Sequence, residues 1–501
     1  MKLESKKESK KENKVFKVVI VGAGVVGSAI ARELSMYKNL EVSVLEAEDD
    51  VCCGTSKANN SHIVCGADVN ANTIELEMVK RSNRRWEQLA KELDIEFVRC
   101  GSFNVALSDD EFNNVLPAIK KSAEESGVMS TRIIDRRELL EYEPNVSPEA
   151  RGALYIPDDG SMLSYYLVLA LAENAAQNGV KFYFEKRVTD IKYDLLAKHK
   201  YNIKCEDNFV IDADFVINSA GLYSDKISKL AGWNNFDIHP RKGEFWVLDK
   251  KYGNKVNSIV YGCPQPDYRG TTVVRTRDGN LMVGPTARDL VDKEDKSTSE
   301  WGLEKAWEAG KKIFPWLEKS MTIHQYVGLR ARCATIKDYI IGWHPDGEQP
   351  FINAAGIRST GISGSIGIGE YVTELLAQRI SLEMNADFNP YRKGIKSFAK
   401  AESKEEKEKL IAENADYAKI VCRCQKVTEA EIKAALDNPL GVHSLDAIKR
   451  RTKAQMGRCQ GGFCTSRIIS IIEEKKGIDP LTITKRGSGS EVVVARTKEV
   501  L

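Results

Sequence analysis

A glycine-rich turn near the start of the chain, residues 22–27 (GAGVVG), limits the possible folds more than any other feature. An apolar run at 17–21 predicts a buried strand before the turn, and a helix is expected to begin near Val26. A second strand is expected at 41–45, followed by Glu46. Gly22, Gly24 and Gly27 permit a tight turn in which backbone N–H groups meet a pyrophosphate, and Glu46 accepts hydrogen bonds from ribose hydroxyls. This βαβ unit is predicted to bind a dinucleotide, although the glycines do not separate FAD from NAD.

Length and charge exclude several classes of protein. With 501 residues, of which 42% are hydrophobic, the chain is too long for one core and is expected to form two or three domains. Its 74 basic and 72 acidic side chains give a formal net charge of +2, so no net field exists to hold a polyanion. Nucleic acid is therefore not expected as a partner.

Targeting signals and cysteine usage indicate the compartment. Residues 1–14 are a lysine and glutamate run without the apolar core of a signal peptide, and we expect a disordered tail there. No window of about 20 apolar residues predicts a transmembrane segment. Eleven cysteines, an odd number spread along the chain, argue against a disulfide framework and for a reducing compartment. These features predict a cytoplasmic protein.

Two stretches of the chain have strand patterns of their own. Residues 103–107 lie in the first, about 96–150, and residues 245–248 and 281–283 lie in the second, about 236–325. We expect the two stretches to form one mixed β-sheet domain that is inserted into the nucleotide-binding domain and holds the substrate.

The last quarter of the chain differs in composition. Residues 399–418 are charged and helical in pattern, with few residues able to fill a core, and are expected to be a linker. Residues 419–475 are expected to form a small domain, because four of the eleven cysteines fall within it. Residues 476–501, which contain GSGS, are expected to be a polar tail.

Those four cysteines form two closely spaced pairs. One residue separates Cys422 from Cys424, and four residues separate Cys459 from Cys464. Two pairs of thiolates can close a tetrahedral zinc site or supply four ligands to a two-iron cluster, and spacing alone leaves both open. The cations expected to offset part of the negative charge of a cluster are Lys449, Arg450, Arg451 and Arg458.

Three further segments resemble the glycine and D-amino-acid oxidase family of flavoproteins. INSAGLYSD at 217–225 resembles that family's second FAD-contacting motif, and FINAAGIRSTG at 351–361 resembles its C-terminal segment. GTSKANNS at 54–61 lies where the family threads a loop past the FAD phosphates. The resemblance implies an α/β, Rossmann-like FAD-binding domain of the GR2/DAO type over residues 15–398. Beyond the glycine turn and Glu46, it places eight residues at FAD: Thr55, Ser56, Asn60, Ser61, Ala220, Gly221, Gly356 and Gly361.

Within that family, the chain is most similar to the branch of glycerol-3-phosphate dehydrogenases and L-2-hydroxyglutarate oxidases. The similarity lies in PRKGEF at 240–245, GNLMVGPT at 279–286 and GLR at 328–330. The guanidinium of Arg330 can present a planar fork to a carboxylate or phosphate, and the resemblance also places this residue at the substrate. A small anionic substrate is therefore expected.

One position departs from the family pattern. Glycerol-3-phosphate-type members usually carry histidine after the FAD loop, whereas this chain has Cys65 at the matching position. A thiol with a pKa of about 8.5 is a poorer base than a histidine for removing a proton from a carbinol. His62, three residues earlier, is the alternative base, although on a strand it would face the opposite side.

The sequence around the four cysteines, VCRCQKVTEAEI and KRRTKAQMGRCQGGFC, resembles a second family. This is the [2Fe-2S] domain related to bacterioferritin-associated ferredoxin. The resemblance implies a small helical domain in which all four cysteines are ligands of a [2Fe-2S] cluster.

These features predict an FAD-dependent dehydrogenase that oxidises sn-glycerol 3-phosphate to dihydroxyacetone phosphate and passes electrons through the [2Fe-2S] cluster. The resemblance to family members that work beside a second flavoprotein subunit implies that the partner is an electron-accepting flavoprotein or an NAD-linked subunit. Three alternatives stay open. They are an L-2-hydroxy acid dehydrogenase acting on 2-hydroxyglutarate, an amino acid or secondary amine dehydrogenase, and a non-catalytic electron-transfer subunit.

Overall fold

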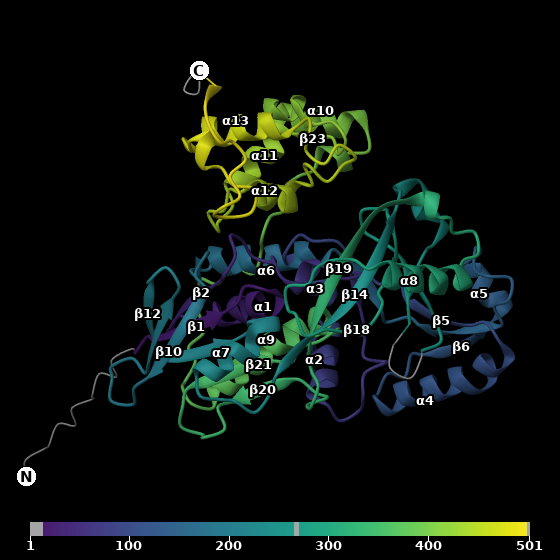
Figure 1. Cartoon of the computed structure of the whole chain (residues 1–501), viewed down its shortest axis with the longest axis horizontal. Helices are drawn as coiled ribbons and strands as arrows, with labels where there is room; N and C mark the ends of the chain where they lie inside the picture. Colours follow the sequence, from purple (N-terminus) through teal and green to yellow (C-terminus); the bar gives the residue numbers. More distant parts are fainter. Residues whose placement is uncertain (1–13, 265–269, 498–501) are drawn as a thin grey trace, which may run out of the picture.

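A computed structural model describes residues 14–264 and 270–497 of the chain. Apart from Lys14, the tail expected at 1–14 lies outside the described residues. Figure 1 shows an α/β part that contains β1 and β2, a sheet-rich lobe that contains β5, β6 and β14, and a small helical part with α11, α12 and α13. The three parts correspond to the predicted nucleotide-binding, inserted-sheet and C-terminal domains.

The α/β part is built on a six-stranded sheet of order β20-β21-β13-β1-β2-β9. All neighbouring pairs are parallel except β20 with β21. Val18, Ile20 and Val44 have no exposed surface, because a parallel sheet is covered on both faces. The strands are β1 (Phe16–Val21), β2 (Leu40–Leu45), β9 (Lys181–Tyr183), β13 (Phe215–Asn218), β20 (Ile340–Trp343) and β21 (Phe351–Ala355).

Helices cover one face of this sheet and a small antiparallel sheet covers the other. On the helical face, α1 packs against both α6 and α9, and α2 packs against α9. On the other face, Tyr201 and Ile203 of the small sheet are buried together with Val19 and Val216 of the main one. The elements are α1 (Val25–Leu34), α2 (Ile74–Asn83), α3 (Trp86–Glu92), α6 (Ser164–Gln177), α9 (Gly361–Ala377), α7 (Ser224–Leu230), β10 (Val188–Tyr193), β11 (Tyr201–Cys205) and β12 (Val210–Ala213).

The inserted lobe is one mixed sheet drawn from both predicted stretches, in the order β18-β14-β17-β16-β15-β5-β7-β6 with β19 paired to β14. β15 is parallel to β5 and the other pairs are antiparallel. The sheet extends beyond the predicted limits through β7 and β19. Its elements are β5 (Ser102–Ala106), β6 (Arg132–Asp135), β7 (Gly152–Ile156), β14 (Ile238–Leu248), β15 (Ile259–Gly262), β16 (Thr272–Arg275), β17 (Leu281–Gly284), β18 (Arg288–Asp289), β19 (Thr322–Cys333), α4 (Leu116–Glu125), α5 (Arg136–Tyr142) and α8 (Glu300–Ile313).

A further short sheet lies between the α/β part and the inserted lobe in the order of the chain. It has the order β3-β8-β4, and its strands are β3 (His62–Ile63), β8 (Gly160–Met162) and β4 (Phe97–Val98). In this sheet His62 is directly opposite Ser161. His62, which follows the long loop after β2, is thereby placed beside the segment that follows β7.

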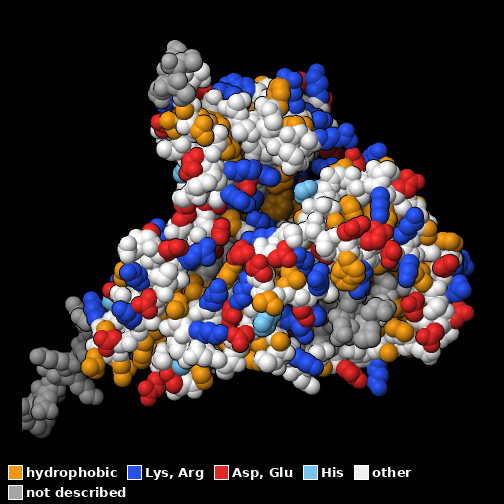
Figure 2. All heavy atoms as spheres, viewed as in Figure 1, with side chains coloured by type: hydrophobic (Ala, Val, Ile, Leu, Met, Phe, Trp, Pro, Cys, Tyr) orange, Lys and Arg blue, Asp and Glu red, His pale blue; other side chains and the backbone are white. Residues whose placement is uncertain are grey.

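The C-terminal part is small and mainly helical, around a core that includes Ile432, Ile468, Ile471 and Ile472. It stands above the rest of the molecule, and Figure 2 shows a hollow between it and the sheet-rich lobe. Its elements are α10 (Lys404–Glu413), β22 (Ile420–Cys422), β23 (Val427–Thr428), α11 (Glu429–Leu436), α12 (Leu445–Thr452) and α13 (Thr465–Lys476).

The linker expected at 399–418 contains α10, a helix without buried residues that begins with a capping box formed by Ser403 and Glu406. Near the end of this segment Tyr417 is buried. One expectation about this part needs correction. The polar tail expected at 476–501 was wrong for its first half, because Ile483 is fully buried in the C-terminal core and Thr484 forms a β-bridge with Glu491. Ile478 and Ile483, which both pack against this core, are too few and too irregularly spaced to give a periodic signal, so composition could not reveal this packing.

Among residues 14–264 and 270–497, no helix is both long enough and apolar enough to cross a bilayer.

Candidate functional site

The glycine turn joins β1 to α1 and packs against the second predicted FAD motif. Gly22 has a φ of +100°, and a Cβ on it would lie 2.7 Å from the carbonyl oxygen of Ser219. A Cβ on Gly27 would lie 1.9 Å from the carbonyl oxygen of Gly22. Only glycine fits these two positions, so the backbone of the turn is free of side chains, as the close approach of a pyrophosphate requires.

The loop at 54–61 is fixed between α1 and β19. Gly24 is the N-cap of α1 and supplies no capping side chain, and the backbone N–H of Val25 donates to Ser56 Oγ at 3.0 Å. Thr55 Oγ1 donates to the carbonyl oxygen of Leu329 at 2.7 Å. The loop therefore runs past the positive end of α1, where an anionic phosphate is stabilised.

The end of this loop has a constrained backbone. Ser61 has a φ of +60°, and its N–H donates to Asn59 Oδ1 at 2.9 Å. Asn60 Oδ1 accepts from the N–H of His62 at 3.3 Å, and its Nδ2 donates to Thr272 Oγ1 at 3.3 Å. These bonds fix the direction in which the chain enters β3 and present His62.

Glu46 follows β2, as predicted. Its carboxylate accepts from the N–H of Ala23 at 2.7 Å and from the N–H of Glu48 at 3.0 Å. Burial raises the pKa of Glu46 to about 7, although both N–H groups act in the opposite direction. The carboxylate therefore lies beside the glycine turn, where ribose hydroxyls of a dinucleotide can donate to it.

The remaining predicted FAD residues lie at turns that follow β13 and β21. The N–H of Ala220 donates to Asn218 Oδ1 at 3.2 Å, and Gly221 has a φ of +55°. Gly356 has a φ of +64°, and Gly361 is the first residue of α9. Because β1, β13 and β21 are adjacent and parallel, these turns share one edge of the sheet with the glycine turn. Glycine-containing turns, two helix N-termini and the carboxylate of Glu46 at one edge of the sheet fit FAD.

His62 forms a dyad with an acid that the sequence analysis did not identify. His62 Nε2 lies 2.8 Å from Asp159 Oδ2, which also accepts from Ser102 Oγ at 2.7 Å. Burial opposes the ionisation of Asp159, but the neighbouring His62 and the hydrogen bonds hold its pKa below the ordinary value. Asp159 is 97 residues away in sequence, and no motif connects it to His62. The carboxylate orients the imidazole, in the arrangement that supports a histidine acting as a base.

Cys65 has a different environment. Its N–H donates to Asp159 Oδ1 at 2.8 Å, while its side chain is buried in an apolar cluster with Leu154 and Ile156. Burial, followed by the nearby Asp159 carboxylate, raises the pKa of the thiol far above its ordinary value. A neutral, buried thiol is a poor proton acceptor. Of the two candidate bases, the geometry favours His62.

Arg330 lies on β19, and its guanidinium donates to backbone carbonyl oxygens. Nη2 donates to Thr286 at 2.5 Å and to Lys242 at 3.2 Å, and Nε donates to Arg241 at 3.3 Å. These three carbonyls fix the direction of the side chain. Arg358, in contrast, is paired with the buried Glu75, so its role in the described structure is structural.

The four predicted cluster ligands are brought together as two pairs. Each pair takes one cysteine from the first sequence motif and one from the second. Cys424 Sγ lies 3.8 Å from Cys459 Sγ, and Cys422 is hydrogen-bonded to Cys464. The N–H groups of Phe463 and Gly461 lower the pKa of Cys459. Two thiolate pairs fit a two-iron cluster, in which each iron takes two cysteines.

The structure corrects the role expected for two of the nearby cations. Arg450 and Arg451 are paired with Asp50 of the α/β part, so their charge is already compensated there. Arg458 is exposed and pairs with Asp249. The sequence places all three close to the cysteines, but α12 directs Arg450 and Arg451 to the domain interface instead.

A largely parallel sheet with a dinucleotide turn at its edge, an inserted mixed sheet and an oriented histidine define a flavin-dependent oxidoreductase. The chain belongs to the family of FAD dependent oxidoreductases, which matches residues 17–375. A second family, the BFD-like [2Fe-2S] binding domain, matches residues 420–474. FAD and a [2Fe-2S] cluster are therefore the cofactors, which confirms the prediction from the sequence.

Three individual proteins illustrate the similarity. The chain is 38% identical over 486 residues to a glycerol 3-phosphate dehydrogenase of Caloramator mitchellensis, covering 97% of this chain and 99% of that protein. It is 23% identical to one of the subunits of the anaerobic glycerol-3-phosphate dehydrogenase of Haemophilus influenzae, covering 91% of this chain and 84% of that protein. The FAD-bound, dithionite-reduced L-alpha-glycerophosphate oxidase of Mycoplasma pneumoniae has a TM-score of 0.71 at 26% identity, covering 76% of this chain and 98% of that chain.

Proposed function

We propose that the chain is an FAD-dependent dehydrogenase that oxidises sn-glycerol 3-phosphate to dihydroxyacetone phosphate and passes the electrons through its [2Fe-2S] cluster to a partner acceptor. The observation that carries this proposal is the match to the Caloramator glycerol 3-phosphate dehydrogenase. That match is nearly complete for both chains, so it includes the C-terminal cluster domain as well as the flavin domain.

The arrangement of His62 suits the oxidation of a secondary alcohol. FAD, when bound, supplies the two-electron acceptor for the hydride of the substrate C–H bond. The hydroxyl proton must leave at the same time. Because Nε2 of His62 contacts Asp159, Nδ1 is the nitrogen able to accept this proton, and Asp159 stabilises the imidazolium that results.

Arg330 suits the binding of the phosphate group. Backbone carbonyls at Lys242 and Thr286 hold its guanidinium in place, so little side-chain freedom is lost when an anion binds. An arginine with a fixed direction favours an anionic substrate over a neutral alcohol.

The cluster domain favours a dehydrogenase over an oxidase. The Mycoplasma oxidase matches along 98% of its own length and still covers only 76% of this chain. A one-electron cluster suits delivery of electrons to a protein acceptor, and the similarity to a protein that is one of the subunits of an anaerobic dehydrogenase makes a second subunit the acceptor that we favour. Cys424 and Cys459 are exposed, whereas Cys422 and Cys464 are buried, so the exposed pair is the side of the cluster that an acceptor can approach.

The test is an anaerobic titration of the protein loaded with FAD and cluster, in which bleaching of the flavin absorption is followed. sn-Glycerol 3-phosphate should bleach the flavin rapidly, whereas L-2-hydroxyglutarate, proline and glycerol without phosphate should not. Bleaching by L-2-hydroxyglutarate or proline alone would transfer the proposal to a different substrate class. A flavin that none of these compounds reduces would favour an electron-transfer subunit without catalysis.

A further inference from the structure

We propose that Asp50, held between Arg450 and Arg451, is a positioning residue that locks the cluster domain to the FAD-binding loop, so that electrons cross from flavin to cluster without any swing of the domain. The inference rests on the proposed route of electrons from the flavin to the cluster. It goes beyond that route because it states how the two redox sites are held relative to each other.

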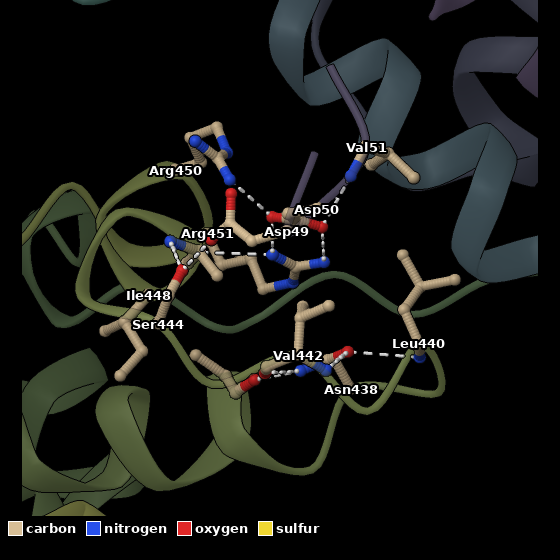
Figure 3. Close-up of polar contacts among 12 residues, drawn as sticks. Asp49, Asp50, Val51, Asn438, Leu440, Val442, Ser444, Ile448, Arg450 and Arg451 are labelled. Atoms are coloured by element: carbon tan, nitrogen blue, oxygen red, sulfur yellow. Dashed lines mark hydrogen bonds and ion pairs between the residues drawn. The ribbon is translucent and has the colours of Figure 1, made fainter. Parts of the chain in front are cut away.

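The centre of the domain interface is a buried carboxylate with two arginine partners (Figure 3). Arg451 binds Asp50 through both terminal nitrogens, with Nη1 to Oδ2 at 2.8 Å and Nη2 to Oδ1 at 3.2 Å. Arg450 Nη2 donates to Oδ2 at 2.8 Å. The side chain of Asp50 is fully buried, and those of Arg451 and Arg450 are 2% and 8% exposed. Burial alone would raise the pKa of Asp50, but the two arginines hold it below the ordinary value.

A second acid extends the network into the α/β part. Arg451 Nε donates to Glu173 Oε1 at 3.0 Å, so the guanidinium lies between two carboxylates from different elements. Glu173, on α6, also accepts from Arg392 Nε at 2.7 Å. Arg451 is therefore fixed from two directions. Loss of the guanidinium from the docked state would leave Asp50 buried with one partner fewer, which is costly, so the network holds the docked orientation.

Apolar and hydroxyl contacts surround this network. Leu440, Val442 and Ala447 of the cluster domain are buried in the same core as residues of α1 and α6. Ser444 Oγ donates to Asp49 Oδ2 at 2.5 Å, which adds a bond beside Asp50 (Figure 3). An interface with a shared apolar core and buried ion pairs differs from the polar, loosely packed contact expected of domains that move.

One side of the interface is part of the flavin site. Asp50 lies in the loop between Glu46, which is placed to bind the ribose, and Thr55, at the phosphate loop. The N–H of Cys52 donates to the carbonyl oxygen of Ala23 at 3.1 Å, so this loop is joined to the glycine turn. Contacts at Asp50 therefore act directly on the backbone that holds FAD.

The other side of the interface leads to the cluster ligands. Arg451 lies on the last turn of α12, and Cys459 follows eight residues later. Between them, Lys453 forms an ion pair with Asp278, in the turn between β16 and β17. The segment that carries two ligands is therefore held at α12 and at the sheet lobe. The rate of electron transfer falls steeply with the distance between flavin and cluster. A fixed distance between the two therefore gives a constant rate.

The experiment measures electron transfer from flavin to cluster separately from reduction of the flavin. In anaerobic stopped-flow measurements on the full, cofactor-loaded chain, the flavin is reduced either by sn-glycerol 3-phosphate or by light with a photosensitiser, and the cluster absorption is followed. We expect wild-type transfer to be independent of added sucrose. In Asp50→Asn with FAD bound and the flavin reduced by light, electrons should pass to the cluster at least about tenfold more slowly than in the wild type, with a rate that falls as viscosity rises.

Asp249→Asn is the matched control, because Asp249, at the end of β14 in the sheet lobe, pairs with Arg458 of the cluster domain, whose side chain is 86% exposed. This substitution should leave transfer unchanged. Wild-type transfer that slows in proportion to viscosity would overturn the proposal, and so would an Asp50→Asn variant with normal transfer. The wild-type measurement needs no variant to fold. Failure of glycerol 3-phosphate to reduce a flavin that light reduces would count against the substrate assignment and not against the locked interface.

Discussion

The C-terminal domain uses arginines in two opposite ways. On α12, Arg450 and Arg451 are buried, and both are paired with Asp50. At the cluster, Arg423 and Arg458 are exposed, and Arg423 lies over the ring of Phe463, itself 56% exposed. A buried pair is costly to break, whereas an exposed one contributes little to stability. The domain therefore has one face that is committed to the flavin domain and one that is open to another molecule.

The same contrast holds for the two redox sites. The flavin side has an oriented histidine, a buried aspartate and a loop with bonds at both ends, all of which favour a fixed substrate geometry. The cluster side has one buried and one exposed cysteine pair. Electrons would thus enter at an enclosed site and leave at an open one, and substitutions on each side should affect different steps.

The largest effect is expected from removing the exposed cysteine pair of the cluster site. The double substitution Cys424→Ser and Cys459→Ser should remove the cluster and abolish turnover with a one-electron acceptor such as cytochrome c, since two of four ligands are lost. Flavin bleaching by substrate should persist. Cys100→Ser, a change at a half-buried cysteine away from the cluster, is the control and should retain both activities. Unchanged turnover in the double variant would show that electrons leave directly from the flavin.

On the enclosed side, His62→Gln should lower the rate of flavin reduction by about 10²–10⁴-fold, because the proton acceptor is lost. Cys65→Ala, at the position where the family usually has histidine, should change this rate by less than about threefold, since a neutral buried thiol takes no proton. Single-turnover reduction of the flavin measures both effects. If the Cys65 variant were the slower of the two, the assignment of the base would have to be reversed.

The contrast between buried and exposed arginines predicts a difference in stability. Arg451→Met should destabilise the docked C-terminal domain by about 3–5 kcal/mol, because Asp50 and Glu173 lose a shared partner while remaining buried. Arg458→Gln should cost no more than about 1 kcal/mol. The free energy of the first unfolding transition in urea, with limited proteolysis to identify the domain that is released, compares them. If both variants lost the same free energy of unfolding, the buried and exposed arginines would not differ in their contribution to stability.

The smallest expected effect concerns pH. The pKa of Glu46 is about 7 in the folded chain, above its ordinary value, so folding of the apoprotein favours the protonated acid and this contribution is lost as pH rises through 7. The pH dependence of FAD binding has the opposite sign to that of folding. Ribose hydroxyls donate to the ionised carboxylate, so FAD binding favours the ionised form. FAD affinity should therefore rise up to about tenfold between about pH 6 and pH 8. Equilibrium dialysis measures it, and Glu46→Gln should remove the dependence; a persistent dependence would assign it to another group.

Much of the flavin domain could be predicted from the sequence, because its signals are local. The turn at 22–27, the acid at Glu46 and the motifs at 217–225 and 351–361 each combine a strand, a glycine turn and a following element, and each lies where it was expected. The sequence around the cysteine pairs, through its resemblance to the [2Fe-2S] domain, likewise predicted the second cofactor. Such features depend on residues that are close together along the chain.

What could not be predicted depends on contacts between distant residues. Asp159 meets His62 only after the chain has passed through the inserted sheet, and the pairing of β3 with β8 that joins them leaves no pattern. Arg450 and Arg451 resemble partners for a cluster, but α12 is oriented by Leu440, Val442 and Ala447 packing against the α/β core, which directs both arginines away from it. The segment after α13 packs through Ile478 and Ile483, whose irregular spacing gives no pattern that the sequence could reveal.

The central claim is that substrate electrons reach the cluster through the flavin. The most direct measurement is anaerobic mixing of the cofactor-loaded chain with sn-glycerol 3-phosphate, followed by rapid freezing and electron paramagnetic resonance of the cluster. The account predicts that the flavin bleaches and that the signal of a reduced [2Fe-2S] cluster then develops as fast as turnover requires. A flavin that bleaches while the cluster stays oxidised would contradict it.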